Sequence, residues 1–148
     1  MTFDEPKMHP VSDARLIVLP QHFEDNGDLA VIEGLTGVPF QIARVFLVRA
    51  PMGAVRGQHA HKRCAQFMVC PAGRVEVLCD DGTSTANFVL DRVGLGLLVP
   101  PSVWAQQTYQ AMGSSLTVLT DRPYEAEDYI REYADFRAYR GVVGAVGS

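Results

Sequence analysis

Apolar and polar residues alternate over short segments of this chain, and glycine, proline and aspartate separate the segments. Such alternation is typical of β-strands with one buried face. The turn-forming sequence Asp80-Asp81-Gly82 predicts a hairpin, and residues 21–28 form a polar segment with a turn signal. Many short strands joined by tight turns predict a sandwich or jelly roll. We expect strands over residues 14–19, 29–33, 41–49, 66–70, 74–79, 85–90, 96–99, 104–109 and 115–120, and another beginning after Gly53.

The period changes near the C-terminus. From Glu127 to Arg140 the apolar residues recur every three or four positions, as in Tyr129, Tyr133 and Phe136. This spacing predicts an amphipathic helix that packs on the barrel or on a partner subunit. We expect residues 141–148 to be frayed.

Length and composition predict one domain over residues 1–148. The chain has 148 residues, of which 47% are hydrophobic, and this suits a single globular core. We find no apolar run as long as a membrane span and no signal peptide at the start, so we expect a cytoplasmic protein without a membrane partner. The three cysteines lack the paired spacing of a zinc or redox motif, so we expect buried free thiols.

The charge is distributed unevenly. A net charge of −4 argues against a nucleic-acid-binding protein. Between Glu33 and Glu76 there is no acidic residue, although six basic residues fall in this interval: Arg44, Arg49, Arg56, Lys62, Arg63 and Arg74. This basic region predicts an anionic ligand such as a phosphate ester.

Two histidines lie within the same basic region. His59 and His61 are separated by one residue, and side chains alternate along a strand, so we expect both imidazoles on one face of the sheet. Two neighbouring imidazoles without a metal are suited to proton transfer at neutral pH.

The spacing around this pair resembles the first signature of the cupin barrels. The matching residues are Gly53, His59, His61, Gln66 and Gly73. In metal-binding cupins a glutamate usually stands at the position of Gln66, and a later strand adds a histidine that residues 101–106 lack. Because two ligands of four are missing, we expect no bound metal.

A longer set of motifs resembles the metal-independent cupins that act as dTDP-4-keto-6-deoxyhexose 3,4-ketoisomerases in deoxysugar biosynthesis. The likeness covers roughly residues 25 to 137. Its most specific parts are the Arg56-Gly57-Gln58-His59-Ala60-His61-Lys62 string and the Asp128-Tyr129-Ile130-Arg131 string. The resemblance implies an all-β cupin jelly-roll barrel with a C-terminal α-helix, no cofactor and a homodimer.

The implied reaction moves a ketone from C4 to C3 of a nucleotide-linked sugar. It needs a base at carbon and proton donors at oxygen, because the intermediate is an enediolate. We expect His61 or His59 to move the carbon proton while the other histidine serves the oxygens. The resemblance also implies substrate-binding residues, which are Arg56, Arg44, Gln66, Lys62 and Trp104.

The chain departs from the family pattern at three positions. Phe46 and Leu47 stand where tyrosines are common, and Ala105 stands where a histidine follows the tryptophan. Two alternatives stay open for this reason. One is a keto-sugar epimerase, with Tyr109 or Tyr124 as an acid across the sugar ring, and the other is a non-catalytic cupin that binds a nucleotide sugar.

Overall fold

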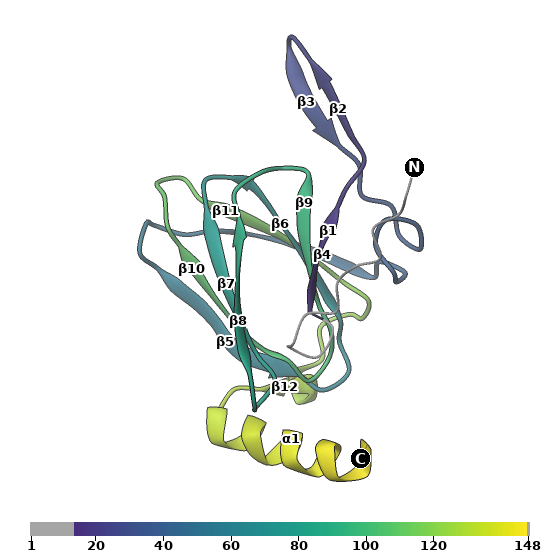
Figure 1. The fold of residues 1–148 in the computed structure, drawn as a ribbon, viewed down its shortest axis with the longest axis vertical. Coiled ribbons are helices and arrows are strands. Elements are labelled where there is room, and N and C mark those ends of the chain that lie inside the picture. The colour runs from purple at the N-terminus through teal and green to yellow at the C-terminus, as the bar shows by residue number, and fades with distance from the viewer. Residues whose placement is uncertain (1–13, 148) are drawn as a thin grey trace.

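The computed structural model describes residues 14–147 and consists mainly of antiparallel strands (Figure 1). A short 3-10 helix, η1 (Ala126–Asp128), and one α-helix, α1 (Tyr133–Gly147), accompany them. The strands are β1 (Arg15–Val18), β2 (Gln21–Glu24), β3 (Gly27–Ala30), β4 (Arg44–Arg49), β5 (Val55–His61), β6 (Gln66–Ala72), β7 (Val75–Asp80), β8 (Thr85–Leu90), β9 (Leu95–Val99), β10 (Trp104–Tyr109), β11 (Ser115–Thr120) and β12 (Tyr129–Ile130).

Two five-stranded sheets form the barrel. The first has the order β1-β9-β6-β11-β4 and the second the order β12-β5-β10-β7-β8. The paired strands of both sheets run antiparallel, and the predicted hairpin at Asp80-Asp81-Gly82 joins β7 to β8. This arrangement is the cupin-type jelly roll, and it confirms the predicted all-β fold with one C-terminal helix.

The main core lies between the two sheets. Inward-facing residues of both sheets fill it, among them Met68, Val77, Leu97, Tyr109 and Val118. Alternation explains why: along β6, Met68 and Cys70 enter this core, whereas Phe67 and Val69 face outward. The outward residues are covered by the segment between β3 and β4, which contributes Ile32, Val38, Phe40 and Ile42.

The C-terminal region differs from the prediction. We expected a helix from Glu127 to Arg140, but α1 begins at Tyr133 and continues to Gly147. The residues before it form η1 and then β12, in which Tyr129 pairs with His61 and Ile130 with Ala60. A partner strand was available on β5, so pairing overrode the helical spacing. The part of the expected frayed tail that is described, residues 141–147, is helical.

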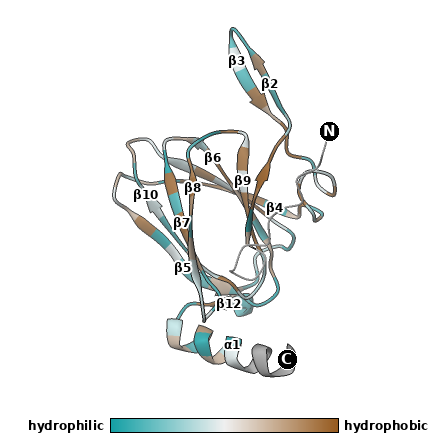
Figure 2. Ribbon diagram, in the orientation of Figure 1, coloured by the Kyte–Doolittle hydropathy of each residue, from teal (hydrophilic) through white to brown (hydrophobic). Residues whose placement is uncertain are grey.

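The N-terminal region also needs a correction. The polar segment over residues 21–28 contains the expected turn at residues 25–26, but strands β2 and β3 flank that turn as a two-stranded hairpin, and residues 31–33 are not a strand. The hairpin projects beyond the barrel and carries both apolar and polar residues (Figures 1 and 2). In the described part of the chain, no helix has the length and apolar character needed to cross a membrane.

Close packing at Gly96 generates a stability prediction. A Cβ added to Gly96 would overlap the ring of Phe67, which is fully buried. We expect Gly96→Ala to lower the free energy of unfolding by about 1–3 kcal/mol, because the ring would have to move within a close-packed layer. Urea denaturation measures this change.

Gly141→Ala is the matched control. Gly141 lies in α1, and no atom lies within 4 Å of an added Cβ. Alanine should be neutral or stabilising there, because it favours a helix more than glycine does. Equal effects of the two substitutions would contradict the packing argument.

Candidate functional site

The two histidines lie side by side at the C-terminal end of β5, as their spacing predicts. The ring centroids of His59 and His61 are 5.1 Å apart with the rings nearly perpendicular. His61 is buried at 6% exposure, and His59 is partly buried. His59 is opposite Ala105 of β10, which lies in the core between the sheets, so the pair faces the barrel interior.

A β-bulge brings Arg56 to the same face. Gly57 and Gln58 both have positive φ angles, 84° and 53°, and here the β5–β10 register shifts by one residue. Arg56 is therefore opposite Gln107, and His59 is opposite Ala105, two positions along the same face of β10. Simple alternation would have placed Arg56 and His59 on opposite faces.

Asp128 holds His61 in place. The Asp128 Oδ2 atom lies 3.1 Å from His61 Nδ1, and Asp128 is itself buried. The backbone N–H groups of Arg63 and Cys64 also donate to this carboxylate, at 2.7 and 3.2 Å. Because an ionised carboxylate only accepts, the proton of His61 belongs on Nδ1 and its Nε2 carries a lone pair.

His59 is fixed in the same way by the backbone. Its Nδ1 lies 2.9 Å from the carbonyl oxygen of Gly57, which only accepts, so Nδ1 carries the proton. The Nε2 atom of each ring is therefore unprotonated in the neutral state. Both rings can serve as bases.

Burial keeps both histidines neutral. Burial and the neighbouring His61 lower the pKa of His59 to about 4, although the hydrogen bond to Gly57 acts in the opposite direction. Burial also lowers the pKa of His61, against the effect of Asp128. Burial alone would raise the pKa of Asp128, but the donors from Arg63 and His61 outweigh it and hold that pKa below its ordinary value.

Tyr129 lies against both histidines. Its ring centroid is 4.3 Å from that of His61 and 5.0 Å from that of His59. The guanidinium of Arg131 covers Tyr129 at 4.3 Å, and Tyr124 lies 5.5 Å from Tyr129. The site therefore combines two bases, two phenols and a cation on one edge of the barrel.

Arg44 reaches this site from the other sheet. Its guanidinium lies 4.7 Å from the ring of Phe46 and 5.4 Å from the ring of Tyr124. Gln66 is buried on the interior face of β6, two positions before Met68 of the core. Arg44 and Gln66 are thus interior residues, as the resemblance implies.

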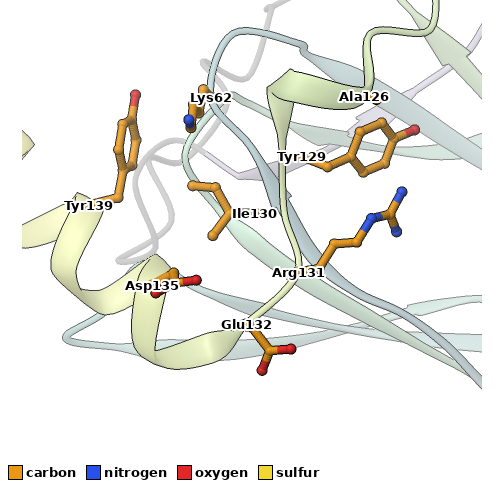
Figure 3. A pocket seen from close by; sticks show the side chains of 8 residues that line it. All are labelled: Lys62, Ala126, Tyr129, Ile130, Arg131, Glu132, Asp135 and Tyr139. Carbon is orange, nitrogen blue, oxygen red and sulfur yellow. The ribbon is translucent and has the colours of Figure 1, made fainter.

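The structure places Trp104 away from the histidines and Lys62 in a neighbouring depression. Trp104 lies on the outer face of the second sheet at 8% exposure, packed between Tyr133 and Phe136. It anchors the helix, so its assignment as a substrate-binding residue is not supported. Lys62 lines a depression of about 510 Å³ between β12 and α1, which Tyr129 and Arg131 also line but neither histidine does (Figure 3).

The metal ligands of other cupins are not assembled here. A neutral amide at Gln66 and a methyl group at Ala105 leave two imidazoles, which do not fit a tightly bound divalent ion. Within residues 14–147, donor atoms of His61, Cys64 and Asp128 lie within 4.8 Å of one another. The Asp128 oxygens already accept N–H donors, and burial raises the pKa of Cys64 to about 11, so we interpret the group as a hydrogen-bonded cluster.

Sequence reasoning assigned no role to Asp128, Tyr129 or Arg131. They appeared only within a motif that carried the resemblance, inside a segment expected to be helical. The available signal was the short alternation Asp128-Tyr129-Ile130-Arg131, in which Ile130 faces the helix while Tyr129 and Arg131 face away from it (Figure 3).

Proteins similar to this chain in sequence and fold include sugar 3,4-ketoisomerases. A TDP-4-oxo-6-deoxy-alpha-D-glucose-3,4-oxoisomerase from Aneurinibacillus thermoaerophilus is 34% identical over 126 residues, which are 84% of this chain and 91% of that protein. QdtA, a sugar 3,4-ketoisomerase from Thermoanaerobacterium thermosaccharolyticum solved with TDP, superposes with a TM-score of 0.85 and 28% identity, over 88% of this chain and 96% of that chain.

A 3,4-ketoisomerase from Helicobacter canadensis has a similar structure, with a TM-score of 0.84 and 27% identity over 87% of this chain and 98% of that chain. The family described as FdtA: WxcM-like, C-terminal matches residues 12–141. That match covers most of the sequence, including every site residue discussed above. The chain therefore belongs to the FdtA (WxcM-like, C-terminal) family.

Proposed function

We propose that this protein is a metal-independent isomerase that converts a TDP-linked 4-keto-6-deoxyhexose into the 3-keto sugar. The relatives named above are 3,4-ketoisomerases, and a QdtA variant has been solved with TDP-4-keto-6-deoxyglucose. The observation that carries the proposal is the pair of neutral histidines, 5.1 Å apart, facing the barrel interior. We also infer that the enzyme acts in deoxysugar biosynthesis in the cytoplasm.

His61 is the better candidate for the carbon base. Its Nε2 takes the proton from C3, which leaves an enediolate, and then returns the proton to C4. Asp128 stabilises the imidazolium that forms between these steps, because its carboxylate accepts the Nδ1 proton at 3.1 Å. His59 has a backbone carbonyl instead of a carboxylate to stabilise its protonated form, so it is the weaker base.

His59 suits the exchange between the two oxygens. The O3 hydroxyl must lose its proton as it becomes a ketone, and O4 must gain one. A neutral His59 can accept the first proton on Nε2 and deliver it to O4. Arg56 and Gln66 are then available to hold the sugar oxygens, since both belong to the interior face.

The position of the ketone tests this function. Incubating the protein with TDP-4-keto-6-deoxyglucose in heavy water and following the sugar by NMR should show a 3-keto product. An unmoved ketone with inverted stereochemistry would indicate an epimerase, and bound but unchanged sugar a binding protein. Tyr109 is not available as the acid of an epimerase, because this residue is 1% exposed within the core.

Substitution of each histidine tests its role in that assay. We expect His61→Asn and His59→Asn each to lower turnover by orders of magnitude while TDP affinity is retained, because each removes a proton acceptor and preserves size. Binding of TDP, measured by calorimetry, is the control for folding. Unchanged turnover in both variants would refute the mechanism.

Asp128→Asn should lower turnover nearly as much as either histidine substitution, although residue 128 does not face the substrate. The backbone N–H of Arg63 donates to Oδ1 at the shortest distance, 2.7 Å, and would hold the amide oxygen there. The new NH₂ group would then replace Oδ2, where it faces His61 Nδ1 and leaves the Cys64 N–H without this acceptor. That contact reverses the tautomer and protonates Nε2, which we expect to lower kcat by about 10²–10⁴-fold. Asp128→Glu, which keeps the charge, should recover part of the activity; equal losses would contradict the tautomer argument.

The lowered pKa values predict an acid-tolerant enzyme. A histidine is a base only above its pKa, and burial moves the pKa of His59 from 6.5 to about 4 and lowers that of His61. The acidic limb of kcat/KM should therefore lie below pH 6.5, with little activity lost between neutrality and that pH. A limb centred at the ordinary histidine value would contradict the burial argument.

We infer that two copies of the chain associate. Three exposed apolar side chains on β1, β2 and β3 are Val18, Phe23 and Leu29, at 74%, 70% and 55% exposure. A lone two-stranded hairpin is marginally stable in water, and among residues 14–147 β1 is an edge strand of the first sheet. A second copy would cover both features, and light scattering of the purified chain should give twice the monomer mass.

A further inference from the structure

The backbone of His61 is held by the loop that joins β9 to β10. The Ser102 N–H in this loop donates to the carbonyl oxygen of His61 at 2.6 Å. The ring of His61 is held separately, because Asp128 accepts its Nδ1 proton. His61 is thus fixed through its ring and through its backbone, and the two contacts come from different segments of the chain.

Ser102 has an unfavourable backbone conformation. Its φ angle is 61°, in the left-handed region where the Cβ of a serine is crowded by the backbone. Among residues 14–147, the other positive φ angles outside glycine are those of Leu35 and of Gln58, which belongs to the bulge in β5. Such a conformation persists only where neighbouring groups hold it.

Arg140 of α1 makes the contacts that hold Ser102. Its Nη1 atom donates to the Ser102 carbonyl oxygen at 3.2 Å and to the Ser102 Oγ at 3.0 Å. Both acceptors belong to one residue, so the guanidinium fixes the peptide and the side chain together. Hydrogen bonds from a charged donor are stronger than those from a neutral one. The two contacts are therefore suited to keep Ser102 in the left-handed conformation.

Arg140 is itself fixed by the packing of α1, which lies across the end of the barrel near β12 (Figure 1). Phe136 of this helix is fully buried and packs against Trp104, which follows the loop directly. The stem of Arg140 lies against the turn between β7 and β8, because a Cβ added to Gly82 would be 3.3 Å from the Arg140 Cβ. The helix therefore holds the loop at two points, Ser102 and Trp104.

Arg140 acts on the proposed base from outside the barrel. The Ser102 contact is to the backbone of His61, whereas the His61 ring faces the barrel interior. Arg140 belongs to the helix that covers the outer face of the second sheet. Its loss should therefore change the direction of the His61 ring and leave the binding of the nucleotide sugar unchanged.

We propose that Arg140 is a positioning residue for His61. It holds Ser102 in the left-handed conformation, the Ser102 N–H then fixes the His61 carbonyl, and the fixed backbone directs the ring at the sugar carbon. The assignment rests on the proposed function, because it takes His61 to be the carbon base.

The variant Arg140→Gln separates positioning from binding. We expect it to lower kcat with TDP-4-keto-6-deoxyglucose by about 10- to 100-fold, because a small displacement of a reacting group costs up to about 10²-fold in rate. The affinity for dTDP, measured by calorimetry, should be unchanged. Arg140→Lys should recover part of kcat, since it keeps a charged donor but loses the planar guanidinium.

A second substitution at position 102 distinguishes positioning from a general loss of stability. Glycine adopts positive φ without the Cβ penalty, so the loop would no longer need the guanidinium. We expect Ser102→Gly, added to Arg140→Gln, to regain most of the lost kcat. If Arg140 merely stabilised the helix, this addition would leave kcat low.

Arg137→Gln is the matched control. Arg137 lies about one turn before Arg140 on α1 and is exposed, so its loss should leave kcat unchanged. The proposal is overturned if Arg140→Gln keeps full kcat, if it loses dTDP affinity as strongly as kcat, or if Ser102→Gly does not restore activity.

The NMR signal of the His61 Nδ1 proton tests the positioning without turnover. This nitrogen lies 3.1 Å from Asp128 Oδ2, so the resonance reports where the ring sits beside the carboxylate. Arg140→Gln should shift it, the added Ser102→Gly should return it, and Arg137→Gln should leave it in place. If the unmodified protein does not move the ketone while the resonance follows this pattern, the isomerase function fails and the positioning role stands. An unshifted resonance in Arg140→Gln overturns the positioning role.

Discussion

The site depends on the pairing of two short backbone segments. Tyr129 and Ile130 pair with His61 and Ala60, and this pairing holds Asp128 beside the His61 ring. The backbone N–H groups of Arg63 and Cys64 complete the carboxylate shell, so the loop after β5 and the start of β12 are fixed to each other. One buried carboxylate thus sets the tautomer of a histidine and also closes the edge of the second sheet.

Burial and charge then act together on the histidines. Removing an imidazole from water disfavours its charged form, and the nearby cations act in the same direction, so both rings are kept neutral. A neutral ring with a fixed Nδ1 proton presents a lone pair to the cavity without waiting for deprotonation. Of the two rings, only His61 has a carboxylate that can stabilise a gained proton, and the two roles proposed for these chemically similar residues rest on this difference.

Much of the fold could be predicted from sequence because strand alternation and turn residues are local signals. The strand over residues 104–109 and the hairpin after Asp80 follow directly from them. The bulge at Gly57-Gln58 could not be predicted, because Gln58 rarely adopts positive φ and the register shift depends on the partner strand β10. The sequence therefore did not determine on which face of the sheet Arg56 lies.

The predicted helix over the C-terminal motif was wrong for a related reason. Tyr129, Tyr133 and Phe136 recur at helical intervals, yet the first belongs to a strand and the other two to α1. The His-x-His pair predicted its own geometry because both members lie on one strand. The partners Asp128, Tyr129 and Arg131 come from a segment more than 60 residues later, and only tertiary pairing brings them to the pair.

The three departures from the family pattern do not have equal weight. Leu47 is exposed on the outer face of β4, so its difference does not alter the interior. Phe46 lies beneath Arg44, and Ala105 is opposite His59, so both are interior positions without an exchangeable proton. Proton exchange at the sugar oxygens must therefore fall to groups that the structure places at the same edge. His59 lies 5.1 Å from His61 and has an unprotonated Nε2, which is why the proposed mechanism assigns this exchange to the second histidine.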